Sequence, residues 1–268
     1  MTTSGSRSPV EVRRTDAFLR LARAAAALLH ESQRERGVSA LHVKSGRRLF
    51  ASELAAQRSR TEARRRGVTA LVDSVGPDLL DDALGHAERL AATAEGVAAV
   101  RAEIERASAT PDRVVDAFSA LNSELLSAMD DGVARLGEEE ARGLALATLA
   151  LENAKEKTGL ERARLGAAFV GGGPDERDRV ALAELVASRA TYLHLYGLTA
   201  PAPAAQMLRR VLAAPSAVEV KRIEERVISA PASRVAPVDA NAWFTTISRT
   251  IEMLGDVSNA TLSYFPYA

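Results

Sequence analysis

The chain contains no cysteine, few aromatic residues and no long apolar run, and each absence excludes a class of protein. Without Cys it forms no disulfide bond and carries no thiolate chemistry, and with only four His residues a structural zinc site is not expected. No segment approaches the about 18–20 uncharged apolar residues of a membrane span. No apolar signal-peptide core follows Met1. We therefore expect a cytoplasmic protein without a cofactor or a metal.

The chain also lacks an excess of either charge, with 35 basic and 35 acidic residues. This balance argues against a general nucleic-acid or acidic-membrane binder, which normally carries a basic excess. The arginines between Arg58 and Arg66 spread around a helix instead of forming a stripe, and Glu53 and Glu62 are spaced to pair with them. This run therefore favours a solvated helix face.

Catalytic motifs are missing as well. No HExxH or Gly-x-Ser-x-Gly pattern occurs, and the glycines at residues 171–173 are followed by Pro174 instead of the Gly-Lys-Ser/Thr of a phosphate loop. We therefore expect that the protein is not an enzyme.

Apolar residues recur at spacings of three and four through most of the chain, which predicts an all-helical protein. Phe18, Leu21 and Ala25 begin the first such stripe, and Trp243 and Ile247 begin the last. Strict alternation of apolar and polar residues is absent, so no strand is predicted. Roughly eight helices joined by short loops, one of them expected as a turn at residues 76–77, are typical of antiparallel bundles.

Two charged stretches interrupt this apolar pattern. Residues 31–41 read ESQRERGVSAL and residues 155–163 read KEKTGLERA, so each places a basic–Glu–basic triplet near a glycine. A glycine inside a helix costs about 1 kcal/mol relative to alanine, so it indicates close approach of another backbone or of a ligand. Two interpretations follow from the residues. Either Arg36 and Arg162 converge on one small anion, or, as composition alone favours, they pair with nearby carboxylates (Glu35, Glu156 or Glu161).

The same stretches form part of a longer series of blocks. QRERGVSA at residues 33–40 is followed by Phe50 and by ELAAQRSRT at residues 53–61, then by KEKTGLERA at residues 155–163. The last block begins at Trp243-Phe244 and runs through residues 248–251. In this order the blocks resemble the NIT domain, the nitrate- and nitrite-sensing domain of bacterial signalling proteins. Glu62 departs from the family, where an Asp is common at this position.

The resemblance implies two antiparallel four-helix bundles, packed side by side with long shared helices, and an anion between them. The implied domain covers residues 12–262, with a flexible tail at residues 1–11 and a C-terminal tail at residues 263–268. Arginines of the family's blocks contact the anion. This implies that Arg36 and Arg162 bind nitrate or nitrite, with Arg222, in a loosely matching segment, as a third contact.

The function that the resemblance implies is non-catalytic sensing, with a change in bundle packing as the signal. Because two facing arginines repel each other and are poorly solvated, a bound anion favours the packing that brings them together. The alternative is a helical adaptor that has lost its ligand and contacts other proteins. Carboxylates that neutralise both arginines would favour the adaptor, and a pocket lined by arginines without carboxylate partners would favour the sensor.

The partners follow from the same comparison. Family members usually carry an output module, and none follows the last block here. The chain is therefore either a stand-alone sensor that acts on a separate signalling protein or a fragment of a longer protein. We expect a homodimer, because symmetric dimers are the commonest oligomers. We expect no direct contact with nucleic acid or membrane.

Overall fold

The described residues of the computed structural model are helical and contain no strand, as predicted. They comprise residues 8–80, 82–229 and 237–265. The helices are α1 (Pro9–Lys44), α2 (Ala51–Leu79), α3 (Ala83–Glu105), α4 (Pro111–Ala134), α5 (Glu139–Val170), α6 (Glu176–Thr199), α7 (Ala202–Leu212), α8 (Pro215–Ser229) and α9 (Ala240–Leu262).

Capping residues in the sequence explain several helix starts. The Ser8 hydroxyl accepts hydrogen bonds from the backbone of Val10 and Glu11, and Pro9 occupies the first turn, so α1 begins there. The helix therefore begins before residue 12, where the domain was expected to start. Residues 9–11 belong to the helix, while residues 1–7 of the expected tail lie outside the described part. The turn expected at residues 76–77 is wrong, since α2 continues to Leu79.

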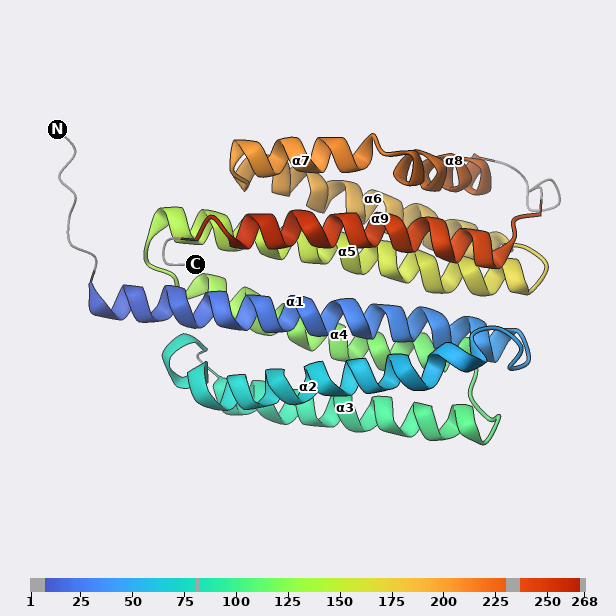
Figure 1. Ribbon diagram of the computed structural model, residues 1–268, viewed down its shortest axis with the longest axis horizontal. Coiled ribbons are helices and arrows are strands. Elements are labelled where there is room, and N and C mark those ends of the chain that lie inside the picture. Colours follow the sequence, from blue (N-terminus) through green and yellow to red (C-terminus); the bar gives the residue numbers. More distant parts are fainter. Residues whose placement is uncertain (1–7, 81, 230–236, 266–268) are drawn as a thin grey trace.

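The helices form two sets, and each has the layout of a four-helix bundle (Figure 1). In the N-terminal bundle, α1 and α3 both pack against α2 and α4, which closes a ring of four. In the C-terminal bundle, α5 packs against α6 and α9. The short helices α7 and α8 lie end to end and both pack on α9, so together they occupy the fourth position.

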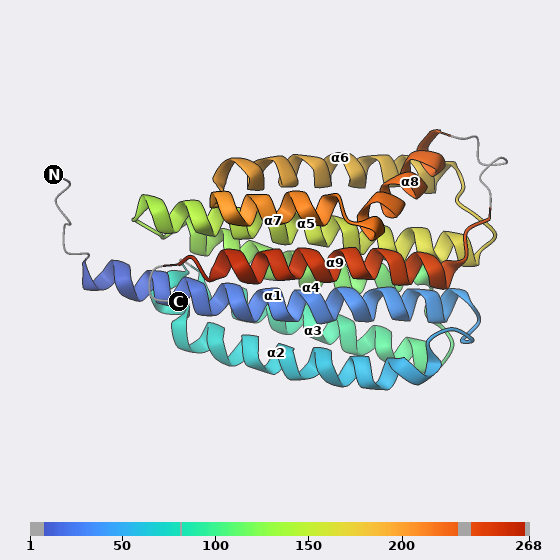
Figure 2. The same ribbon diagram turned by 45° about the horizontal axis from the view of Figure 1, so that its top comes forward.

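The two longest helices form the contact between the bundles (Figure 2). These are α1 with 36 residues and α5 with 32, and they pack against each other. Smaller contacts of α4 with α5 and of α1 with α9 complete the interface. Both charged stretches lie on α1 and α5, so the fold brings them to the boundary between the bundles.

Aromatic contacts fix the last helix and the segment after it. Trp243 of α9 is fully buried, meets Phe169 of α5 edge-on at 5.8 Å between ring centroids, and donates its indole N–H to the Arg162 carbonyl. Phe265 folds back onto Phe18 of α1, with 5.7 Å between ring centroids. Residues 263–265 therefore belong to the folded body, and residues 266–268 lie outside the described part.

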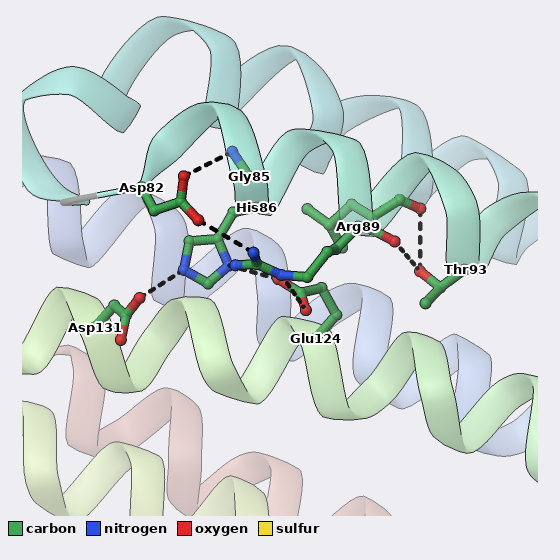
Figure 3. A network of polar contacts seen from close by, with 8 residues as sticks. Asp82, Gly85, His86, Arg89, Thr93, Glu124 and Asp131 are labelled. Atoms are coloured by element: carbon green, nitrogen blue, oxygen red, sulfur yellow. Dashed lines mark hydrogen bonds and ion pairs between the residues drawn. The ribbon is translucent and has the colours of Figure 1, made fainter.

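A buried histidine ties α3 to α4 (Figure 3). Both ring nitrogens of His86 face carboxylates of α4, at 2.5 Å from Glu124 Oε1 and 2.7 Å from Asp131 Oδ2. Arg89 bridges Glu124 to Asp82 at the start of α3. This network holds α3 and α4 together.

Across the described residues, no group of three or more His, Cys, Asp or Glu could hold a metal ion. In the same part of the chain, no helix is long and apolar enough to cross a membrane.

Two buried glutamates and one arginine fix α6 and α8 onto α5. Arg189 Nη1 donates to Glu161 Oε2 at 2.6 Å and to Glu224 Oε1 at 2.8 Å, and Nη2 donates to Glu224 Oε2 at 2.7 Å. Burial raises the pKa of Glu161 well above its ordinary value, Arg189 partly offsets this, and the Glu224 carboxylate raises it again. One guanidinium therefore donates hydrogen bonds to two buried carboxyl groups. Because its pKa is raised, Glu161 keeps its proton to a higher pH than an exposed glutamate does.

We expect Glu161→Gln to remove a pH dependence of stability. Because the pKa of Glu161 is raised in the folded state, its contribution to the free energy of unfolding is complete below the unfolded pKa and is lost as pH rises through the folded one. The advantage of the variant over wild type should therefore grow with pH, by up to about 1.4 kcal/mol per pH unit in that window. Urea denaturation at a series of pH values measures it.

The control for this experiment is Glu219→Gln, on the exposed face of α8. There the hydrogen bond from Arg222 lowers the pKa of Glu219, so no gain with rising pH is expected. A constant difference between Glu161→Gln and wild type across the series would contradict the assignment.

Candidate anion site

The arginines of the two charged stretches cross the α1–α5 contact, and each passes over the glycine of the opposite helix. A Cβ built at Gly159 would lie 2.9 Å from Arg36 Nη2, and a Cβ built at Gly37 would lie 3.1 Å from Arg162 Nε. Both glycines do allow a close approach, but the approaching groups are side chains instead of the expected backbone or ligand. At Gly37 the Phe244 ring lies nearer than Arg162, with its Cε2 2.9 Å from the Cβ position. Any larger residue would therefore displace Arg36 at Gly159, and Phe244 with Arg162 at Gly37.

Arg36 is fully buried and paired with a carboxylate. Its Nη1 and Nη2 donate to the two carboxylate oxygens of Glu156 on α5, at 2.5 Å and 3.2 Å, and Nη1 also donates to Ser119 on α4. Glu156 accepts further hydrogen bonds from Gln33 and Asn122. The charge of Arg36 is therefore neutralised by a well-held carboxylate, as the ion-pair interpretation of the sequence proposed.

Arg162 is equally buried but has no carboxylate partner among the described residues. Its Nη1 donates to Ser248 Oγ of α9 at 2.9 Å, and the guanidinium lies 5.0 Å from the centroid of the Phe244 ring. Its Nε and Nη2 are buried and have no hydrogen-bond partner in the described part of the protein. These two groups donate from the same edge of the guanidinium, so they form a free fork of donors.

Electrostatics make this cation costly. Burial and then the neighbouring charge of Arg36 lower the pKa of Arg162 to about 9. Glu252 and Glu156 raise it again, but less. A buried cation with two unused donors gains more than an exposed one from an anion placed against it.

A pocket of about 540 Å³ is lined by residues that contact Arg162, although Arg162 itself is not part of the lining. Phe244 and Ser248, which both contact the guanidinium, line it together with residues of α1, α2 and α9. Its lining is rich in arginine but also includes two glutamates, of which Glu252 pairs with Arg34 at 3.2 Å. The residues around Arg162 therefore lie beside a pocket whose lining is partly charged and partly apolar (its other basic and acidic lining residues are Arg60, Arg249 and Glu53).

Arg222 does not lie with the other two arginines, so its position gives no support to a role as a third contact. Its side chain is 61% exposed on α8 and pairs with Glu219 at 2.7 Å. The neighbouring Val220 and Ile223 are among the residues of that helix that are buried in the core. Amphipathic spacing alone thus places Arg222 on the outer face.

The residues missed from sequence are Phe244 and Ser248. Both belong to the last block of the family resemblance, and their spacing of four puts them on one face of α9. That spacing was a usable signal, but nothing in it indicated that the face meets Arg162.

We expect Gly159→Ala to destabilise the protein by about 1–3 kcal/mol, although alanine is the better helix former. The new Cβ would lie 2.9 Å from Arg36 Nη2, so the buried Arg36–Glu156 pair must shift. Gly143→Ala on the same helix is the matched control, because a Cβ there meets nothing within 4 Å. Urea denaturation compares them. Equal stability of the two variants would show that the close approach at Gly159 imposes no constraint.

Comparison with known proteins identifies the family and supports the fold. A family model described as nitrate and nitrite sensing matches residues 27–263. Among solved structures, that of the NasR transcription antiterminator superimposes with a TM-score of 0.83 at 20% sequence identity, covering 94% of this chain and 68% of that one. At this identity the similarity establishes the fold. None of the curated proteins compared matches the chain in sequence.

Proposed function

The chain belongs to the nitrate and nitrite sensing family, and we propose that it binds one of these anions at Arg162, beside Arg36. The observation that carries this proposal is the buried Arg162 guanidinium, whose Nε and Nη2 have no partner among the described residues. A planar anion fits such a fork, since two of its oxygens can accept one N–H each. The Nε of Arg36 is also buried without a partner among the described residues.

The position of the site supports a signal without catalysis. Arg162 belongs to α5 and contacts Ser248 and Phe244 of α9, while Gly37 of α1 lies against its Nε. These helices come from both bundles, so an anion here stabilises the packing that keeps them together. Without the anion, the charge of Arg36 still disfavours the charge of Arg162 across the interface, because Glu156 offsets this effect only in part. The anion thereby shifts the balance between two packings, and a separate signalling protein reads the result.

The adaptor function has one observation in its favour, the neutralised Arg36. An adaptor that has lost its ligand has no use for a buried arginine without a carboxylate, however, and replacement by an apolar side chain would make such a core more stable. The state of Arg162 therefore favours the sensor.

Calorimetric titration with sodium nitrate and with sodium nitrite tests the proposal, with sodium chloride as the control for ionic strength. We expect saturable heat from wild type and none from Arg162→Met. Arg222→Met is the matched control, because it removes an exposed arginine that has its own partner, and it should bind as wild type does. If wild type binds neither anion, the adaptor function replaces the sensor.

A further inference from the structure

We propose that Glu156 sets the charge of the ligand that the site accepts, so that only monovalent anions bind. This inference rests on the proposed function and adds a specificity-determining residue to it. The observation behind it is the buried juxtaposition of two guanidiniums with one carboxylate.

The two buried guanidiniums and the one buried carboxylate together carry one net positive charge. Arg36 and Arg162 are 0% and 2% exposed and lie close enough for each to affect the other. Glu156, at 5% exposure, neutralises Arg36 through both of its oxygens. A monovalent anion at Arg162 therefore brings the buried group to neutrality.

A divalent anion would leave one negative charge uncompensated in the same buried place. Burial of an unpaired charge is strongly unfavourable, and the penalty grows as the local dielectric falls. Glu156 cannot move aside, because its two oxygens accept four hydrogen bonds, from Gln33, Arg36 and Asn122. The carboxylate thus acts as a fixed counter-charge that admits nitrate and rejects sulfate.

Pocket size is the competing explanation for such selectivity, since sulfate is larger than nitrate. The two explanations separate when the charge changes and the volume does not. Glu156→Gln keeps the side-chain volume and raises the net charge from one to two. Size exclusion would leave sulfate rejected in this variant, whereas charge control would admit it.

The experiment is a competition titration of nitrate against sulfate at constant ionic strength, on wild type, Glu156→Gln and Glu152→Gln. For wild type we expect sulfate to bind at least about a hundredfold more weakly than nitrate. For Glu156→Gln we expect the ratio of the sulfate dissociation constant to the nitrate dissociation constant to be at least about tenfold lower than in wild type. Glu152→Gln removes a buried carboxylate one turn earlier on α5, where it pairs with Lys155, and should leave the ratio unchanged.

The double variant Arg36→Gln/Glu156→Gln guards against a failure of Glu156→Gln to fold. It restores one net positive charge, so we expect sulfate to displace nitrate no better than in wild type, even if both anions bind more weakly. Three results would each overturn the inference. The first is an unchanged ratio of sulfate to nitrate dissociation constants in Glu156→Gln, and the second is a lower ratio in the double variant than in wild type. The third is tight binding of sulfate by wild type. Absence of nitrate binding by wild type would instead overturn the proposed function itself.

Discussion

Replacing Arg162 with methionine should abolish nitrate binding while leaving the ligand-free protein at least as stable as wild type. The two effects have one cause, because Arg162 is a buried cation without a carboxylate. Its pKa is lowered to about 9, so the folded state disfavours the charged side chain at neutral pH relative to the unfolded chain. This penalty is complete below that pKa and fades as pH rises from it toward the ordinary pKa of arginine.

Methionine keeps the apolar stem of Arg162 in place and removes the buried charge. Similar replacements of buried ionic groups are neutral or stabilising by about 1–4 kcal/mol. We expect a gain in this range, reduced by the loss of the Ser248 hydrogen bond and the contact with Phe244. Urea denaturation without nitrate and thermal denaturation with and without it measure both effects. A ligand-free variant clearly less stable than wild type would show that Arg162 is structural.

Replacing Arg36 with methionine should have the opposite effect on stability, a loss of about 3–5 kcal/mol. This change leaves Glu156 buried with its negative charge uncompensated, and two of its four hydrogen bonds are lost. Ser119 also loses the hydrogen bond from Nη1. The two arginines of similar sequence surroundings thus differ in role: one completes a buried ion pair and the other offers free donors.

The double variant Arg36→Met/Glu156→Met is the control for this prediction. It removes both charges together, so most of the lost stability should return. Urea denaturation of the two single variants and the double variant closes the cycle. If Arg36→Met were as stable as wild type, Glu156 would not depend on Arg36 for its charge balance.

Much of the fold follows from the sequence because apolar periodicity and capping residues act locally. The stripes that begin at Phe18 and Trp243 are the buried faces of α1 and α9. The expected turn at residues 76–77 failed because a Gly-Pro pair is a local signal, and here the backbone of α2 stays helical to Leu79. The start of α1 at Pro9 could have been placed from Ser8 and Glu11, which form a capping box.

The site was less predictable, because pairing between helices depends on their register. Glu156 and Glu161 were both offered as partners, yet they point from different sides of α5. Glu156 meets Arg36 of α1, and Glu161 meets Arg189 of α6. Positions five apart on a helix differ by about 140° in direction, which predicts that they separate but not which neighbour each one meets. Arg162 has neither as a partner, and only the packed structure shows this.

A crystal structure grown with nitrate tests the central claim most directly. We expect a planar anion with oxygens within hydrogen-bond distance of Arg162 Nε and Nη2, while the Arg36–Glu156 pair stays intact beside it. An anion bound elsewhere, with Nε and Nη2 of Arg162 left unoccupied or turned to a carboxylate, would contradict it.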